Sequence, residues 1–380
     1  MLPSKPEQSA KTPLIPVLYT TLASLLLVAL APLPWLTRVH LALAVGVMPL
    51  IFVAILYFSP TLTRTAPASG WQVAPPWLAL LAGGLAVASF LVWEEVRMVA
   101  LLLAMVATLW LFYQLHQRRH RCLGTPHGGL WWYQLALACL FLGLLAMGVG
   151  VLFPAYYPLA RLIHLHLNLL GFVAITALGT LHVLLPTMLA TFDPTTAQRL
   201  HQDWPFALAA PLLIAVGSVW WSPLAMLGGL FALVAPLQLA KGLWRLRERC
   251  RNGHGGVHSL LMALAAFLAM PPLSMLLPHH GLLVGFFVQA FLMPLISGAA
   301  AHLLPLWLLS DPQYASWRQE AQGQLFRFAL LRAILFLLAA IAGLHEASWS
   351  WPLAGLAMAS FLVQVGVVVW RMPCRHLPRN

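Results

Sequence analysis

Seven histidines lie within long apolar stretches of the sequence, where a polar side chain is costly and usually functional. Five of them open such stretches: His40, His164, His166, His279 and His280. Neutral imidazole is the commonest metal ligand in proteins, and two histidines on opposite faces of a haem give an electron-carrying iron. Five histidines at one end of three stretches therefore predict a haem or metal centre. For any single one of them, hydrogen bonding to a carbonyl is the alternative.

The other two histidines, His182 and His302, lie deeper in their stretches. His182 follows His166 by 16 residues, or about 24 Å along a helix, so the two cannot share a site. We interpret both as partners of water or backbone, with a second metal pair as the alternative. The eight remaining histidines are expected to be mostly solvated in loops or at span ends: His116, His120, His127, His201, His254, His258, His345 and His376.

Residue spacing on a helix separates the candidate ligands. His164 and His166 point to opposite sides of one helix, since residues i and i+2 differ by about 200°, so each can address a different neighbour. Arg38 and Arg161 precede His40 and His164 by two and three residues. Because arginine matches carboxylate geometry, we expect both to pair with haem propionates; lipid headgroups are the alternative partners.

The composition determines which elements can carry these residues. Of 380 residues, 61% are apolar and 8% are charged, and the mean hydropathy is +0.85. A soluble domain carries about 25% charged residues, so soluble, disordered and disulfide-stapled classes are excluded. Apolar runs continue over ~20 residues without alternating, which excludes a membrane β-barrel. The chain is predicted to be an all-α integral membrane protein.

Twelve membrane spans are predicted, at 14–36, 39–58, 76–93, 97–116, 130–152, 158–190, 205–221, 223–243, 258–277, 280–309, 324–343 and 351–370. With a cytoplasmic N-terminus, seventeen Lys and Arg residues fall on the inner side and three on the outer side. This bias predicts a multi-pass protein of the bacterial inner (cytoplasmic) membrane with both termini cytoplasmic. The net charge of +12 then reflects loops facing anionic lipid rather than nucleic acid.

Charged residues are expected to be rare inside the membrane. All nine acidic residues map to loops or termini, and Arg332 is the single clear intramembrane charge, placed to snorkel or to face the bundle. Ion-coupled transporters and proton pumps usually place acids or lysines in the bilayer. The pattern argues against both classes.

An internal repeat links the histidines. In spans 2, 6 and 10, histidine is followed by glycine and later by proline: His40 with Gly46 and Pro60, His164 with Gly171 and Pro186, and His279 with Gly285 and Pro305. The third copy has a few extra residues before its proline. The repeat unit is therefore four helices, and one membrane domain, 1–380, is expected to contain the copies 13–116, 130–243 and 258–371.

These features resemble the catalytic subunit of haem-copper oxidases. The stretch from His164 to Pro186 is also similar to an element of NnrS-type membrane haem proteins. The resemblance implies twelve helices in three pseudo-symmetric four-helix arcs. Span 7 lacks the histidine pair of the oxidases, and Asn168 stands where they carry a tyrosine four residues after histidine. Proton-pumping oxygen reduction is therefore not expected.

The sequence thus predicts a membrane haem protein with one or two b-type haems, and copper as a further candidate. No Cys-x-x-Cys-His motif for c-type haem is present. The expected role is respiratory electron transfer or nitric-oxide metabolism, as an oxidoreductase related to the oxidases. The expected partners are membrane lipid, quinol or an external electron-transfer protein, and a small gaseous ligand. The alternatives are a haem or copper carrier and a non-metal transporter with histidine relays.

Overall fold

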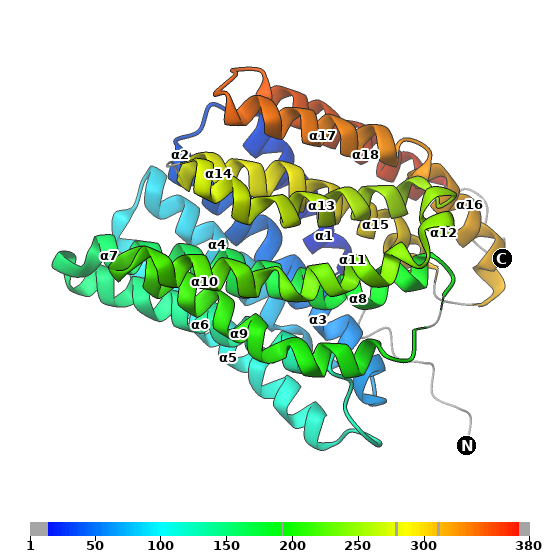
Figure 1. Ribbon diagram of the computed structural model, residues 1–380, viewed down its shortest axis with the longest axis horizontal. Helices are drawn as coiled ribbons and strands as arrows, with labels where there is room; N and C mark the ends of the chain where they lie inside the picture. Colours follow the sequence, from blue (N-terminus) through cyan, green and yellow to red (C-terminus); the bar gives the residue numbers. More distant parts are fainter. Residues whose placement is uncertain (1–13, 192, 278–279, 310–311, 372–380) are drawn as a thin grey trace. The chain divides into compact units, whose positions relative to one another are not determined.

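The computed structural model describes residues 14–191, 193–277, 280–309 and 312–371 (Figure 1). Within these ranges the regular structure is helical and no β-strand occurs. Eleven helical segments there are long and apolar enough to cross a membrane, and a shorter apolar helix, α1 (Leu14–Leu30), precedes them. The chain is therefore an all-α, multi-pass membrane protein, as its composition predicts.

Most predicted spans correspond to an observed helix within a few residues at each end, but the helices of spans 205–221 and 324–343 begin nine residues earlier than predicted. The observed helices are α4 (Pro75–Leu91), α5 (Arg97–His120), α6 (Gly129–Leu152), α9 (Thr196–Trp220), α10 (Ser222–Ala232) with α11 (Val234–Trp244), α13 (Gly255–Leu276), α16 (Ala315–Phe326) with α17 (Ala329–Leu344), and α18 (Ser350–Arg371). The predicted first span, 14–36, is too long. Its helix ends at Leu30 because Pro32 and Pro34 follow, and proline supplies no backbone N–H to continue a helix.

Spans 2, 6 and 10 each contain a π-helical segment. They are α2 (Trp35–His40), η1 (Leu41–Val47) and α3 (Met48–Thr63); α7 (Tyr157–His166), η5 (Leu167–Ala174) and α8 (Ile175–Met188); and α14 (His280–Phe286), η6 (Phe287–Leu292) and α15 (Met293–Leu308). π-helical turns are rare and often mark functional sites. These three are also the most buried of the candidate spans.

The π-helical segments align spans 2, 6 and 10 with one another. Each is followed, after almost the same interval, by the proline of its copy: Pro60, Pro186 and Pro305. His40 and His166 directly precede η1 and η5, whereas His280 and η6 are separated by most of α14. The extra residues of the third copy therefore precede its π-helical segment, and they place His280 about 7 Å further from that segment's end than His40 is from the end of η1.

The described residues group into two compact units. One contains the described residues 14–24, 33–182 and 194–235, and the other contains the described residues 25–32, 183–191, 193, 236–277, 280–309 and 312–371. In the first unit α4 packs on η1, and α6 and α9 pack on η5, while α5, α6, α9 and α10 run alongside one another (Figure 1). In the second unit α13 and α17 pack on η6. The π-helical segments thus lie among neighbouring helices.

Two charged residues, Asp203 and Arg332, are almost completely buried inside these units. Helix α9 begins at Thr196, earlier than its predicted span, and so includes Asp203, which is 2% exposed. The prediction that every acidic residue lies in a loop or terminus is wrong for Asp203. The first turns of α9 contain Arg199 and His201, and their low hydropathy does not mark them as part of a membrane span. Arg332 of α17 is 1% exposed and faces the interior of the second unit.

Candidate metal centre

Histidines from the first two repeat copies meet inside the first unit. His40 is the last residue of α2, and His164 lies in α7. Their ring centroids are 6.3 Å apart, and the ring planes differ by 14°. Phe90 of α4 packs against His40 with its centroid 4.6 Å away. Two imidazoles from spans far apart in sequence therefore lie nearly parallel beside an aromatic ring.

Backbone carbonyls fix the protonation of these rings. Nδ1 of His40 lies 2.8 Å from the carbonyl oxygen of Leu36, one turn earlier in its helix. His166 and His182 make the same contact one turn back, at 2.9 and 2.8 Å. A carbonyl only accepts hydrogen bonds, so in each ring Nδ1–H is the donor and Nε2 carries the lone pair. Metal-binding histidines use this arrangement, in which the second nitrogen is held by a carbonyl.

His164 is held by a different helix. Its Nδ1 lies 3.1 Å from the carbonyl oxygen of Gly143 in α6, so the ring donates there and again presents Nε2 as the unprotonated nitrogen. The amide of Asn168 in η5 also touches this ring: its Nδ2 is 3.0 Å from Nδ1 and 3.3 Å from Nε2. The position of His164 thus depends on residues of both α6 and η5.

The separation of His40 and His164 matches that of two ligands to one metal atom. A metal–imidazole bond is about 2 Å and the bonded nitrogen lies about 1 Å from the ring centre, so two opposed rings have centroids roughly 6 Å apart. The observed value is 6.3 Å. A haem leaves only two axial positions for the protein, and a pair of histidines is the number it needs. In number and donor type, the two histidines fit a haem iron.

His166 faces another neighbour. Ser218 of α9 lies 3.4 Å from its Nδ1, whereas His164 contacts α6 and His40. The two histidines therefore diverge, as side chains two positions apart on a helix must. The structure places His166 outside the pair formed by His40 and His164, and Ser218 is a neighbour that the sequence did not reveal.

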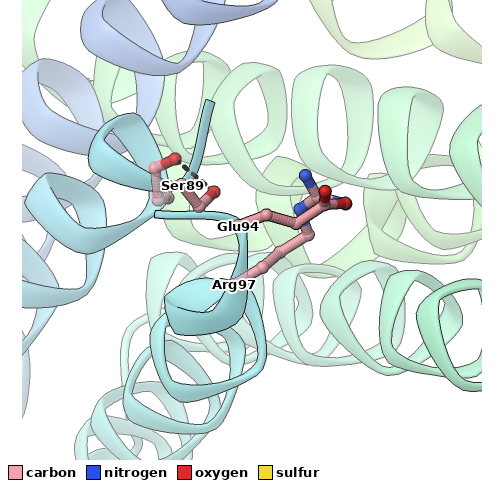
Figure 2. Close-up of polar contacts among 4 residues, drawn as sticks. Ser89, Glu94 and Arg97 are labelled. Carbon is pink, nitrogen blue, oxygen red and sulfur yellow. Dashed lines mark hydrogen bonds and ion pairs between the residues drawn. The ribbon is translucent and has the colours of Figure 1, made fainter. Parts of the chain in front are cut away.

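An arginine missed as a site residue lies beside His40. The guanidinium of Arg97 lies 5.5 Å from the ring centroid of Phe90, which packs on His40. Figure 2 shows Arg97 beside Glu94, to which it is ion-paired at 3.0 Å, while Ser89 bonds back to its own helix. Arg97 is one of only three arginines predicted on the outer side, and this rarity could have marked it as a candidate site residue. The other two, Arg38 and Arg161, are partly buried and exposed, respectively.

The structure describes three of the four remaining candidate ligands, each within its own unit. His279 falls outside the described residues, and His280, in the second unit, is exposed at the start of α14. His182 is fully buried, with its ring 6.1 Å from that of Trp132. In the second unit, the side-chain amide of Gln322 donates to the carbonyl of His302 at 2.9 Å. These last two positions suit hydrogen bonding, the role first assigned to them.

One loop histidine is not solvated as expected. His254 directly precedes α13, and its ring stacks on that of Phe326 with centroids 3.7 Å apart and planes 12° apart. Burial, together with the charges of His302 and His258, lowers the pKa of His254 to about 4. His254 is therefore a neutral packing residue, and its expected solvation is wrong.

Across the part of the chain that the structure describes, no group of three or more His, Cys, Asp or Glu side chains is placed to hold a metal ion. No protein-family model matches the sequence, and a search of curated proteins finds no similar protein.

Proposed function

We propose that this chain is a membrane haem protein in which His40 and His164 would hold a b-type haem. The observation that carries the proposal is the nearly parallel pair of rings, 6.3 Å apart, each donating Nδ1–H to a backbone carbonyl. The haem would supply electron transfer, or the binding of a small gas if one axial position opens. The role is respiratory electron transfer or nitrogen-oxide chemistry in the membrane, with quinol or an external protein as electron donor.

The repeat supports an oxidase-subunit-I-like arrangement of three four-helix arcs. Spans 2, 6 and 10 are the three that contain π-helical segments in the described ranges, and each carries proline at a similar interval beyond that segment. A feature that recurs every four spans is expected of a threefold repeat. In this register the position of His40 is held by His166 in the second copy and by Gly285 in the third, so His164 lies two residues before the repeated position.

The protein's own residues would hold and shape the haem environment. His40 and His164 bind, and the carbonyls of Leu36 and Gly143 keep their Nε2 atoms unprotonated. Phe90 packs beside His40 and excludes water from that side. Arg97, Arg38 and Arg161 lie near the same ends of their helices and suit the carboxylates of a haem edge, because the arginine fork matches carboxylate geometry.

The test is a reduced-minus-oxidised visible spectrum of the purified full chain, with haem quantified per chain. We expect sharp b-type bands at about one haem per chain, and loss of most haem in His40→Ala and His164→Ala. Exposed His120 gives the matched control, and His120→Ala should keep its haem. Added imidazole should restore the bands in His40→Gly, which separates lost ligation from misfolding.

Two results would contradict the proposal. Full haem retention in both alanine variants would remove His40 and His164 as ligands. A featureless spectrum despite ensured haem synthesis would remove the haem and favour a transporter with histidine relays. Substoichiometric, easily extracted haem would instead favour a carrier.

A further inference from the structure

Asn168 covers one face of the His164 ring. Its amide nitrogen lies 3.0 Å from Nδ1 and 3.3 Å from Nε2. An atom at these distances from both ring nitrogens cannot lie in the ring plane, because it would then overlap Cε1, the ring carbon between the two nitrogens. The amide therefore lies over the ring and leaves the Nε2 lone pair, which points outward in the plane, to another partner.

Gly143 makes this placement possible in two ways. Its carbonyl accepts the Nδ1–H of His164 at 3.1 Å. It also has no side chain: a Cβ at Gly143 would lie 2.5 Å from Oδ1 of Asn168 and 3.4 Å from the Cβ of Leu167. Any larger residue would therefore displace Asn168 from the ring. Gly148, further along α6, has open space around it and carries no such constraint.

The orientation of Asn168 is not explained by its own hydrogen bonding. Its Oδ1 is buried, and no residue in the described ranges donates a hydrogen bond to it. A buried acceptor without a donor costs stability, so such an arrangement persists where another requirement holds it. The polar side chain that the amide of Asn168 contacts is His164.

We propose that Asn168 and Gly143 are positioning residues that fix the rotation of the His164 ring and the direction of its Nε2. The carbonyl of Gly143 selects the Nδ1–H form, and the amide of Asn168 presses on one face so that the ring cannot turn. This inference rests on the proposed haem function, since a fixed Nε2 matters for an axial ligand. Partners of this kind tune metal affinity by about 10–100-fold in other proteins.

The haem-bound protein provides the first test. In Asn168→Ala and Asn168→Leu we expect haem to dissociate about 10–100-fold faster and the EPR g-values of the ferric haem to shift, because the axial ring is free to rotate. Gly143→Ala should reproduce both effects by displacing Asn168. The double variant Gly143→Ala/Asn168→Ala should lose haem no faster than either single variant. Gly148→Ala is the control, and its haem dissociation and g-values should match those of the wild type. Unchanged g-values and haem retention in Asn168→Ala and Gly143→Ala would overturn the proposal.

A second measurement does not need haem. With ¹⁵N-labelled histidine, the His164 signals are assigned by their absence in His164→Ala, and their shifts report which nitrogen carries the proton. We expect a single Nδ1–H form in the haem-free wild type and a mixture of forms in Asn168→Ala. A single unchanged form in that variant would overturn the positioning role. If the wild type binds no haem yet passes this test, the proposed function fails while the positioning of His164 stands.

Discussion

Arg332 is a buried cation whose partners are neutral groups. It donates to Oε1 of Gln364 and, at 3.0 Å, to the carbonyl of Leu325, and its guanidinium lies 4.8 Å from the Phe361 ring centroid. Leu325 is in the last turn of α16, whose end carries unsatisfied carbonyls and the negative end of the helix dipole. Arg332 therefore caps the break between α16 and α17, and the helix end supplies the counter-charge.

Replacing Arg332 should destabilise the protein through the acceptors left behind. Arg332→Met leaves the Leu325 carbonyl and Gln364 without their donor, so we expect a loss of about 2 kcal/mol or more in the free energy of unfolding. Arg332→Lys should recover only part of this, because one ammonium cannot match the planar fork. The double variant Arg332→Met/Gln364→Leu should be more stable than Arg332→Met. Thermal unfolding in detergent measures all three, and an Arg332→Met variant as stable as the wild type would contradict the capping role.

The sequence identifies His40 and His164 but not the residues that hold them. Both histidines stand out because a polar side chain opens an apolar span at a repeated position. Gly143 and Asn168 carry no such signal: glycine is common in membrane helices, and an asparagine after histidine has many roles. Their function depends on how α6 is rotated against η5, and hydropathy does not encode that rotation. His254 was missed for the same reason, since its partner Phe326 is remote in the sequence, at the end of α16.

At the scale of elements, the existence of most spans was predictable, whereas some of their ends and the π-helical segments were not. Length and hydropathy define a span, but nothing in the composition of η1 or η6 marks the wider turn. Donors on neighbouring helices lie at or beside two of these segments. Thr21 Oγ1 donates to the carbonyl of Gly46 in η1 at 2.8 Å, and Ser259 Oγ donates to that of Pro294, just after η6, at 2.8 Å. Hydroxyl groups on adjacent helices thus satisfy carbonyls at or beside these segments, a tertiary effect.

Two adjacent glycines of α4 test how closely η1 is packed. A Cβ at Gly83 would overlap the carbonyl of Ala44 in η1, whereas Gly84 has open space around it. We expect Gly83→Ala to lower the unfolding free energy by about 1–3 kcal/mol, as overpacking does. Gly84→Ala should be neutral or slightly stabilising, because alanine favours a helix over glycine. Thermal unfolding of the two variants gives the comparison, and equal effects would mean that η1 and α4 are not in close contact.

At the scale of the whole molecule, charge predicts which end of each span faces the cytoplasm. Arg118, Arg119 and Arg121 gather where α5 ends, and Arg119 lies over the ring of Trp131 at 3.7 Å, a pairing typical of a membrane interface. The opposite end of α6 has no basic residue, and the exposed Phe153 and Tyr156 follow it. The basic end should be cytoplasmic, which places the ends of α2 and α7 that carry His40 and His164 toward the outer face.

Cysteine labelling decides this orientation. Cys122 follows α5 at its basic end, and Ala155 is exposed in the loop after α6. In a background with Cys250 and Cys374 changed to serine, we expect an impermeant maleimide to label Cys122 only in inverted vesicles. With Cys122 also changed to serine, Ala155→Cys should be labelled only in right-side-out vesicles. The reverse pattern would place His40 and His164 near the cytoplasm, and an external electron donor would then have to be replaced by a cytoplasmic one.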